Sequence, residues 1–189
     1  MNTLTSTIPT FPMRPINGGP FHLARPKRGE WVYEPKVNGW RALVNTRTGE
    51  MFNRHGKPLT INDEFWPTLD YFKGSSPYEW LDCEGLARRH ALDRGKIYVL
   101  DYIPESYDKT PWIDRNEALM NGPLADFVLG HYSQDQAMRG WTELQEVNRS
   151  LGCEYYEGFV AKRLDSPYVH QMRSDKEETT LWIKHRWEF

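Results

Sequence analysis

The chain has 189 residues, with 24 lysines and arginines, 26 aspartates and glutamates, and two cysteines. This length suits one domain, and a net charge of −2 argues against strong nonspecific binding of a polyanion by the whole surface. Two cysteines are too few for a disulfide framework. No stretch is long and apolar enough for a membrane span, and no signal-peptide pattern opens the chain. We therefore expect a cytoplasmic protein with no membrane partner.

The first part of the chain is expected to form an arm and then a set of strands. Residues 1–20 are rich in threonine, proline and glycine, which predicts an irregular arm before a single domain over residues 21–189. Strands are predicted next at residues 31–36, 41–45 and 50–53. Thr48 and Gly49 suit the hairpin turn between the last two strands.

Three helices are predicted further along. Asn62 can cap the first helix, and Pro67 either limits this helix to its first turns or kinks it. Its apolar side is expected to carry Phe65, Trp66, Leu69 and Phe72. The second helix is expected to begin with Thr110 as the cap and Pro111 as the first helical residue, and to run to Met120.

The third helix has the clearest boundaries. Ser133 and Gln136 fit a capping box, and Gly152 fits the stop signal after Leu151. Apolar residues recur at helical spacing along it, so we expect this helix to be core scaffold. Those residues are Ala137, Trp141, Leu144, Val147 and Leu151.

The charged residues that suggest chemistry fall on predicted strands or strand ends, at residues 81–86, 97–102, 157–162 and 182–186. In the last of these, Lys184 and Arg186 share a face, because alternate residues of a strand point the same way. Strands with intervening helices predict an α+β fold, in which mostly antiparallel sheets form a cleft.

Lys36 is the candidate nucleophile. It precedes a glycine turn, and Arg41 follows five residues later. A lysine amine in this setting can attack the α-phosphorus of a nucleotide and form a lysyl-nucleotide phosphoramidate, while cations stabilise the departing pyrophosphate. Attack needs a neutral amine, which partial burial and neighbouring cations favour. Surface hairpins also carry such a string, so the prediction depends on the downstream partners.

The downstream partners of Lys36 are the four charged blocks described above, and they follow one another in a characteristic order. Together with the Lys36 segment they make five ordered blocks over residues 12–186, and the chain resembles the nucleotidyltransferase (adenylation) domain of ATP-dependent DNA ligases. RNA ligases and mRNA-capping guanylyltransferases share this superfamily. The resemblance implies an ATP-grasp-like fold with a nucleotide-binding cleft. The spacing of Tyr168, Arg173-Ser174 and Trp182 also resembles a DNA ligase pattern.

The resemblance implies a role for each matching residue. Glu34 is expected to help recognise adenine, and Arg41 and Glu84 to hold the ribose hydroxyls. Glu157, with Glu84 as a further candidate, is expected to bind Mg²⁺. The phosphates of ATP, the AMP donor, are then expected to meet the cations Lys162, Lys184 and Arg186.

Two positions depart from the family pattern. Asn38 stands where the family has an aspartate before the glycine, which keeps the turn-forming hydrogen bonds but removes a charge. Leu100 stands where the family has an aromatic platform for the base. Tyr98 points to the same face and is a candidate for stacking on the base instead, with simple core packing as the alternative.

Arg54 is the main candidate for a nucleic-acid contact, because the family arginine at this position grips the 5′-phosphate of a nick. Nicked double-stranded DNA is the expected partner of a monomeric ligase that could serve replication, repair or recombination equally well. The sequence shows no OB-fold after Arg186, so a separate OB-fold domain or partner protein is a further expectation. The open alternatives are an RNA ligase, a capping-type guanylyltransferase, and a non-catalytic module that binds nucleotides or DNA ends.

Overall fold

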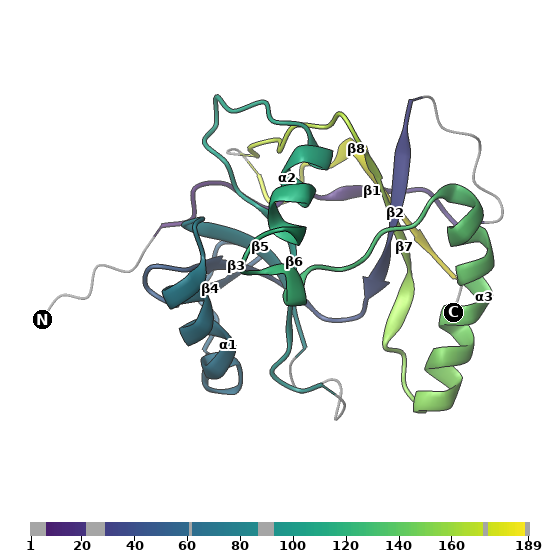
Figure 1. The fold of residues 1–189 in the computed structure, drawn as a ribbon, viewed down its shortest axis with the longest axis horizontal. Coiled ribbons are helices and arrows are strands. Elements are labelled where there is room, and N and C mark those ends of the chain that lie inside the picture. Colours follow the sequence, from purple (N-terminus) through teal and green to yellow (C-terminus); the bar gives the residue numbers. More distant parts are fainter. Residues whose placement is uncertain (1–6, 22–28, 61, 87–92, 172–173, 188–189) are drawn as a thin grey trace, which may run out of the picture.

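A computed structural model describes residues 7–21, 29–60, 62–86, 93–171 and 174–187. The described residues contain two four-stranded sheets with helices packed beside them (Figure 1). One sheet has the order β1-β8-β7-β2, and the other has the order β4-β3-β5-β6. The strands β1 and β8 are parallel, and all the other pairs are antiparallel. The predicted α+β class with mostly antiparallel sheets is therefore confirmed.

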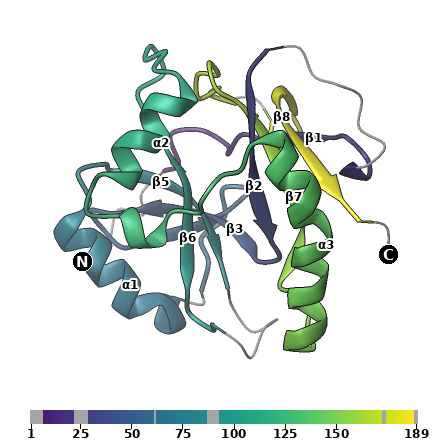
Figure 2. The same ribbon diagram turned by 45° about the vertical axis from the view of Figure 1, so that its right-hand side comes forward.

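The first sheet combines strands from both ends of the chain. Its strands are β1 (Pro15–Asn17), β2 (Trp31–Val37), β7 (Tyr156–Arg163) and β8 (Thr179–Arg186). The helix α3 (Gln134–Leu151) lies along β7 and β2 (Figure 2). As predicted, Ser133 and Gln136 form a capping box, and Gly152 ends the helix in the left-handed conformation.

The second sheet is formed by β3 (Trp40–Asn45), β4 (Met51–Asn53), β5 (Trp80–Gly85) and β6 (Ile97–Tyr102). Three helical segments accompany it: α1 (Asn62–Ser75), α2 (Trp112–Met120) and the short 3₁₀ segment η2 (Ala125–Phe127). Its largest apolar cluster is buried between the sheet, α1 and α2. Burying such a cluster is the main favourable contribution to folding.

The connection from β2 to β3 carries the chain from one sheet to the other. It consists of Asn38 and Gly39, so Lys36 at the end of one sheet lies close in sequence to Arg41 at the start of the other. A side chain at Gly39 would bring its Cβ to 2.7 Å from the carbonyl oxygen of Gly85. Only glycine therefore fits here. The tight turn keeps the end of β2 and the start of β3 close together, beside the space between the sheets.

Several local expectations differ from the structure. Residues 15–17, expected in an irregular arm, form β1 because β8 offers a free edge to pair with. Trp66, expected on the apolar side of its helix, is 55% exposed, and the helix continues through Pro67 to Ser75. The side chain of Asn62, the expected cap, lies outside the described residues.

The other two helices differ from the predictions in detail. The cap position of α2 is Pro111 rather than Thr110, and no side chain caps this helix. On α3, Ala137 is buried, whereas Val147 and Leu151 are exposed, because the sheet covers only part of the helix. The described residues include no helix with both the length and the apolar character that crossing a membrane requires.

Candidate active site

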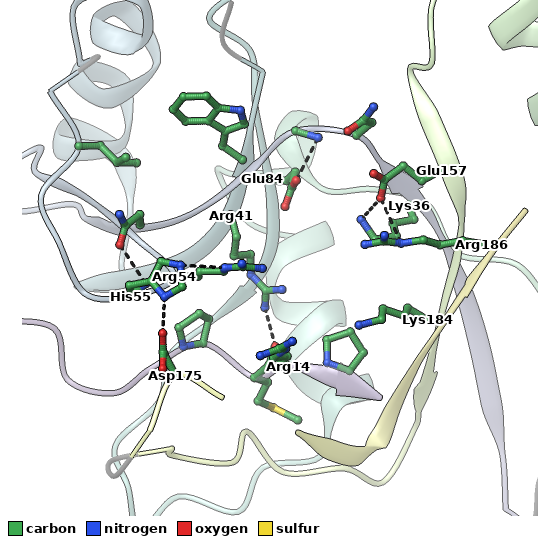
Figure 3. Close-up of a pocket in the computed structure, with 18 residues that line it drawn as sticks. Arg14, Lys36, Arg41, Arg54, His55, Glu84, Glu157, Asp175, Lys184 and Arg186 are labelled. Carbon is green, nitrogen blue, oxygen red and sulfur yellow. Dashed lines mark hydrogen bonds and ion pairs between the residues drawn. The ribbon is translucent and has the colours of Figure 1, made fainter. Parts of the chain in front are cut away.

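A pocket of about 510 Å³ opens between the two sheets, and charged side chains dominate its lining (Figure 3). They come from β2, β3, β5, β7, β8, the turn after β4 and the segments just before β1 and β8. The charged residues and the histidine that line it are Arg14, Lys36, Arg41, Arg54, His55, Glu84, Glu157, Asp175, Lys184 and Arg186. A concave site with convergent polar groups is where a ligand is expected.

Lys36 lines this pocket and forms an ion pair with Glu157 (Figure 3). The two residues come from neighbouring strands, because β2 pairs with β7 and Lys36 is opposite Gly158. The same carboxylate oxygen, Oε2 of Glu157, lies 3.5 Å from Nε of Arg186. Glu157 therefore holds two cations at once, and the Lys36 side chain is only 17% exposed.

Glu84 faces this group from the other sheet. Its Oε1 accepts a hydrogen bond of 3.0 Å from the backbone N–H of Gly39 in the turn after Lys36. Burial raises the pKa of the Glu84 carboxyl, and the charges of Lys36 and Arg41 oppose this increase. The nearby charge of Glu157 adds to it, so two carboxylates from different sheets influence one another across the pocket.

Arg41 forms an ion pair with Asp82, which lies outside the pocket lining. The guanidinium forms two hydrogen bonds to this fully buried carboxylate, and its Nη2 also donates to the carbonyl oxygen of Met13 at 3.1 Å. The hydroxyl of buried Tyr168 donates to Asp82 as well, at 2.7 Å. Asp82 was not among the predicted site residues. The available signal was that Asp82 precedes Glu84 by two residues on a predicted strand, so the two side chains point to the same face.

A smaller cavity of about 60 Å³ adjoins the pocket and shares Lys36, Arg41 and Glu84 with it. Glu34, Leu100 and Lys162 also line this cavity. Lys162 Nζ lies 2.6 Å from Oε2 of Glu34 and donates to the carbonyl oxygen of Leu100 at 2.9 Å. It also lies 4.3 Å from the centre of the Trp182 ring.

Lys184 contrasts with Lys36 and Lys162. Its ammonium has no hydrogen-bond or ion-pair partner within the described part of the chain. Burial lowers the pKa of Lys184, and the charges of Arg186, Arg14 and Lys36 lower it further, while Glu178 opposes them. A half-buried cation among other cations is a favourable place for an anion to bind.

Arg54 approaches the pocket from the turn after β4. Its Nε donates to Nε2 of His55 at 3.1 Å, and Nδ1 of His55 contacts Asp175. For Nε2 to accept this bond, the imidazole must be neutral with its proton on Nδ1. Asp175 therefore selects the His55 tautomer that orients Arg54.

The comparison with known proteins rests on structure. No family model matches the sequence, and no curated protein matches it. The structure is similar to that of the ligase domain of M. tuberculosis LigD, with a TM-score of 0.64, 21% identity, and coverage of 94% of this chain and 59% of that one. This chain has the fold of a DNA ligase nucleotidyltransferase domain.

Two further structures with this ligase fold resemble the chain. A mycobacterial DNA ligase D complexed with ATP has a TM-score of 0.62 and 22% identity, with coverage of 94% of this chain and 60% of that one. A Chlorella virus DNA ligase-adenylate has a TM-score of 0.53 and 17% identity, with coverage of 92% and 67%. The chain thus spans about three fifths of the length of the two mycobacterial structures.

Most of the predicted site residues of this ligase-fold domain meet around the two cavities. The residues that line one or both of them are Glu34, Lys36, Arg41, Arg54, Glu84, Leu100, Glu157, Lys162, Lys184 and Arg186. Tyr98 lines neither cavity. Its hydroxyl is 2.7 Å from that of Tyr155, and it packs in an apolar cluster with Val37. The structure thus favours core packing for Tyr98, and its stacking on the base stays a prediction.

Lys162 also differs from its prediction. Its side chain is 2% exposed and bonded to Glu34, so it does not join Lys184 and Arg186 in the larger pocket. Lys162 shares the face of the sheet that carries Glu34 and Lys36, but it pairs with Val32, further along β2, and lines the smaller cavity. Arg14 was not predicted, because it precedes a strand too short to be detected from sequence.

The carboxylates fit a magnesium ion only together with a bound nucleotide. Among the residues that the structure describes, no group of three or more histidines, cysteines, aspartates or glutamates could hold a metal ion. Glu84 and Glu157, however, both line the larger pocket. Mg²⁺ commonly binds one or two carboxylates and completes its shell with phosphate oxygens and water.

Proposed function

We propose that this chain is the catalytic domain of an ATP-dependent DNA ligase in which Lys36 forms a covalent lysyl-AMP. The observation that carries the proposal is the position of the Lys36 amine, which contacts Glu157 in a cation-rich pocket beside a smaller cavity. A solved ligase with this fold is complexed with ATP, and another is a ligase-adenylate, which supports ATP as the AMP donor.

The first step transfers AMP to the lysine. The Lys36 amine releases a proton and attacks the α-phosphorus, so a nitrogen–phosphorus bond forms while the bond to pyrophosphate breaks. The ion pair with Glu157 must open before this attack. Arg186 contacts the same carboxylate and can retain Glu157 when the lysine leaves it.

The two cavities suggest how the nucleotide lies. The adenine would enter the small cavity, which Glu34 and Leu100 line, and the ribose would lie between Arg41 and Glu84 at the shared wall. The α-phosphate would then reach Lys36, with Arg186 beside it and Lys184 near the phosphates that follow. Preorganised cations of this kind stabilise negative charge that develops in the transition state.

A magnesium ion would be held by Glu84 and Glu157 together with phosphate oxygens. It would supply neutralisation of the charge on the phosphates. Because these carboxylates lie on opposite sheets, the residues of this chain can present oxygen ligands from both walls of the pocket.

The AMP would then pass to the 5′-phosphate of nicked double-stranded DNA, and a 3′-hydroxyl would displace AMP to seal the nick. Arg54 is the proposed contact for the 5′-phosphate, because it enters the pocket from the wall opposite Glu157 and has no carboxylate partner among the described residues (Figure 3). The mycobacterial and Chlorella virus structures compared above are DNA ligases, which favours DNA over RNA as the polynucleotide.

Intact-protein mass spectrometry tests the proposal. After incubation with Mg²⁺ and ATP, we expect the wild type to gain the mass of AMP, and GTP to give no adduct. The Lys36→Ala variant should gain no mass, whereas Lys73→Ala, which alters an exposed lysine on α1, should react like the wild type. Sealing of nicked DNA, compared with nicked RNA, then identifies the polynucleotide.

The contrary result is equally informative. If the wild type binds ATP but forms no adduct with either nucleotide and seals no pre-adenylylated nick, the ligase proposal is wrong. The chain would then be a non-catalytic module that binds nucleotides.

A further inference from the structure

Arg14 reaches the active site because β1 joins the sheet beside β8. Asn17 lies opposite Lys184 in the parallel pairing, and the N–H of Gly18 donates to the carbonyl oxygen of Lys184 at 2.9 Å. At the other end, the N–H of Thr179 donates to the carbonyl oxygen of Arg14 at 2.8 Å. These backbone bonds fix the segment, and the Arg14 side chain extends into the larger pocket (Figure 3).

The larger pocket carries more positive than negative charge. Glu157 is shared by Lys36 and Arg186, and the partner of Arg41 is Asp82, which lies behind the pocket wall. Lys184 has no ion-pair partner in the described ranges. The pocket therefore offers cationic groups that no carboxylate of the described chain neutralises.

The contact that Arg14 makes with the protein is weak. Its Nε lies 3.4 Å from Oε1 of Glu178, and both side chains are more than a third exposed, at 37% and 38%. Exposed pairs of this kind contribute little to stability. Arg14 can therefore turn from Glu178 to a ligand at small cost.

Arg14 and Lys184 also lie near enough to influence each other. The charge of Arg14 contributes to the lowered pKa of Lys184, in addition to burial and the charge of Arg186. Gathering cations in a partly desolvated site is unfavourable unless an anion binds there. The anion must carry several charges to offset this group.

We propose that Arg14 and Lys184 form a subsite for the β- and γ-phosphates of ATP, and for the pyrophosphate that leaves. This subsite rests on the proposed function, and it adds Arg14 as a residue that binds the leaving group. The β1–β8 wall suits this role because it also presents Arg186 beside Glu157 and Lys36, where the α-phosphate would react. Arg54 lies across the pocket and is left for the polynucleotide.

The reverse reaction tests the subsite most directly. When pyrophosphate is added to the preformed lysyl-AMP, its oxygen attacks the α-phosphorus, the nitrogen–phosphorus bond breaks, ATP forms and Lys36 regains a proton. We expect Arg14→Ala to raise the half-saturating pyrophosphate concentration by about tenfold or more, since a hydrogen bond to a charged group is lost. Arg14→Lys should restore part of this loss.

Glu178→Gln is the matched control. It removes the carboxylate that competes for Arg14, so pyrophosphate should bind as well as in the wild type or better. The pocket lining does not include Glu178. If Arg14→Ala leaves the pyrophosphate dependence unchanged, the subsite is wrong, and a defect confined to sealing of a pre-adenylylated nick would instead assign Arg14 to the polynucleotide.

A direct binding measurement separates this inference from the proposed catalysis. Isothermal titration of unmodified protein with inorganic pyrophosphate needs no covalent step. Binding by the wild type that is weakened in Arg14→Ala, without any adduct from ATP, would retain the subsite and overturn the ligase proposal. An adduct with unaltered pyrophosphate binding in Arg14→Ala would do the reverse. Thermal unfolding of the variants confirms that each is folded.

Discussion

Glu34 and Lys162 form a buried ion pair in which Oε2 and Nζ lie 2.6 Å apart and the side chains are 3% and 2% exposed. The pair lies on the neighbouring strands β2 and β7 and lines the small cavity proposed for adenine. Burial raises the pKa of Glu34, and the charge of Lys162 opposes this change. Each charge is therefore tolerated only because the other is present.

Glu34→Ala should destabilise the protein by about 3–5 kcal/mol, because it leaves the Lys162 ammonium buried without a counter-charge. The double variant Glu34→Leu with Lys162→Met should be clearly more stable than the single one, since no isolated charge remains. Urea denaturation measures both. Glu146→Ala, in the exposed pair with Arg149, should change stability by about 0.5 kcal/mol or less. Equal losses in the single and double variants would contradict this account.

Tyr168→Phe tests the support behind Arg41. The variant removes one hydrogen bond to the buried carboxylate of Asp82, which keeps its two bonds from Arg41. We expect a loss of about 1.5–3 kcal/mol in the free energy of unfolding, the usual range for a bond to a charged group. Chemical denaturation gives this value. No loss would mean that water replaces the hydroxyl.

Gly158 separates Glu157 from Phe159 and has a φ of 137°. A Cβ at this position would lie 2.0 Å from the carbonyl oxygen of His185 on β8. Gly158→Ala should cost at least about 1–3 kcal/mol from the backbone conformation alone. It should also slow adduct formation, because the strand that carries Glu157 must shift. Thermal unfolding and the rate of AMP incorporation check the two effects, with Gly74→Ala, where a Cβ meets nothing, as the control.

Arg54→Ala should weaken binding of nicked DNA and reduce the slope of log affinity against log salt concentration by about 1, as expected for one phosphate contact. Fluorescence anisotropy over a range of salt concentrations measures this slope. Arg139→Ala, an exposed arginine on α3 outside both cavities, should leave the slope unchanged. An unchanged slope in Arg54→Ala would remove Arg54 from the DNA interface.

Pyrophosphate binding should depend on pH through Lys184. Burial and Arg186 lower the pKa of Lys184 from 10.5, so its charge is complete only below that lowered pKa and is lost as the pH rises through it. Affinity should therefore begin to fall at a lower pH than an ordinary lysine would give. Lys184→Arg keeps its charge and should move this decline to higher pH. Titration calorimetry measures the affinity of both proteins at each pH. The ionisation of pyrophosphate affects both alike, so the difference between the two profiles reports on residue 184. Identical profiles would exclude Lys184 as the cause.

The sequence alone carried the local information. The strands around Lys36, the capping box of α3 and the glycine that ends it depend on residues a few positions apart, and all three were predicted. The set of residues around the two cavities was largely predictable as well, because the charged residues occur in five short blocks whose order resembles a known family.

Only the tertiary structure decided which charges meet. Lys36 and Glu157 are 121 residues apart, and Asp82 and Tyr168 are 86 apart, so their contacts depend on how β2, β5, β7 and the segment before β8 pack. Packing also buried Lys162 against Glu34 and brought Arg14 to the pocket through β1. Coulomb interactions depend on distance in space and on burial, and neither can be obtained from spacing along the chain.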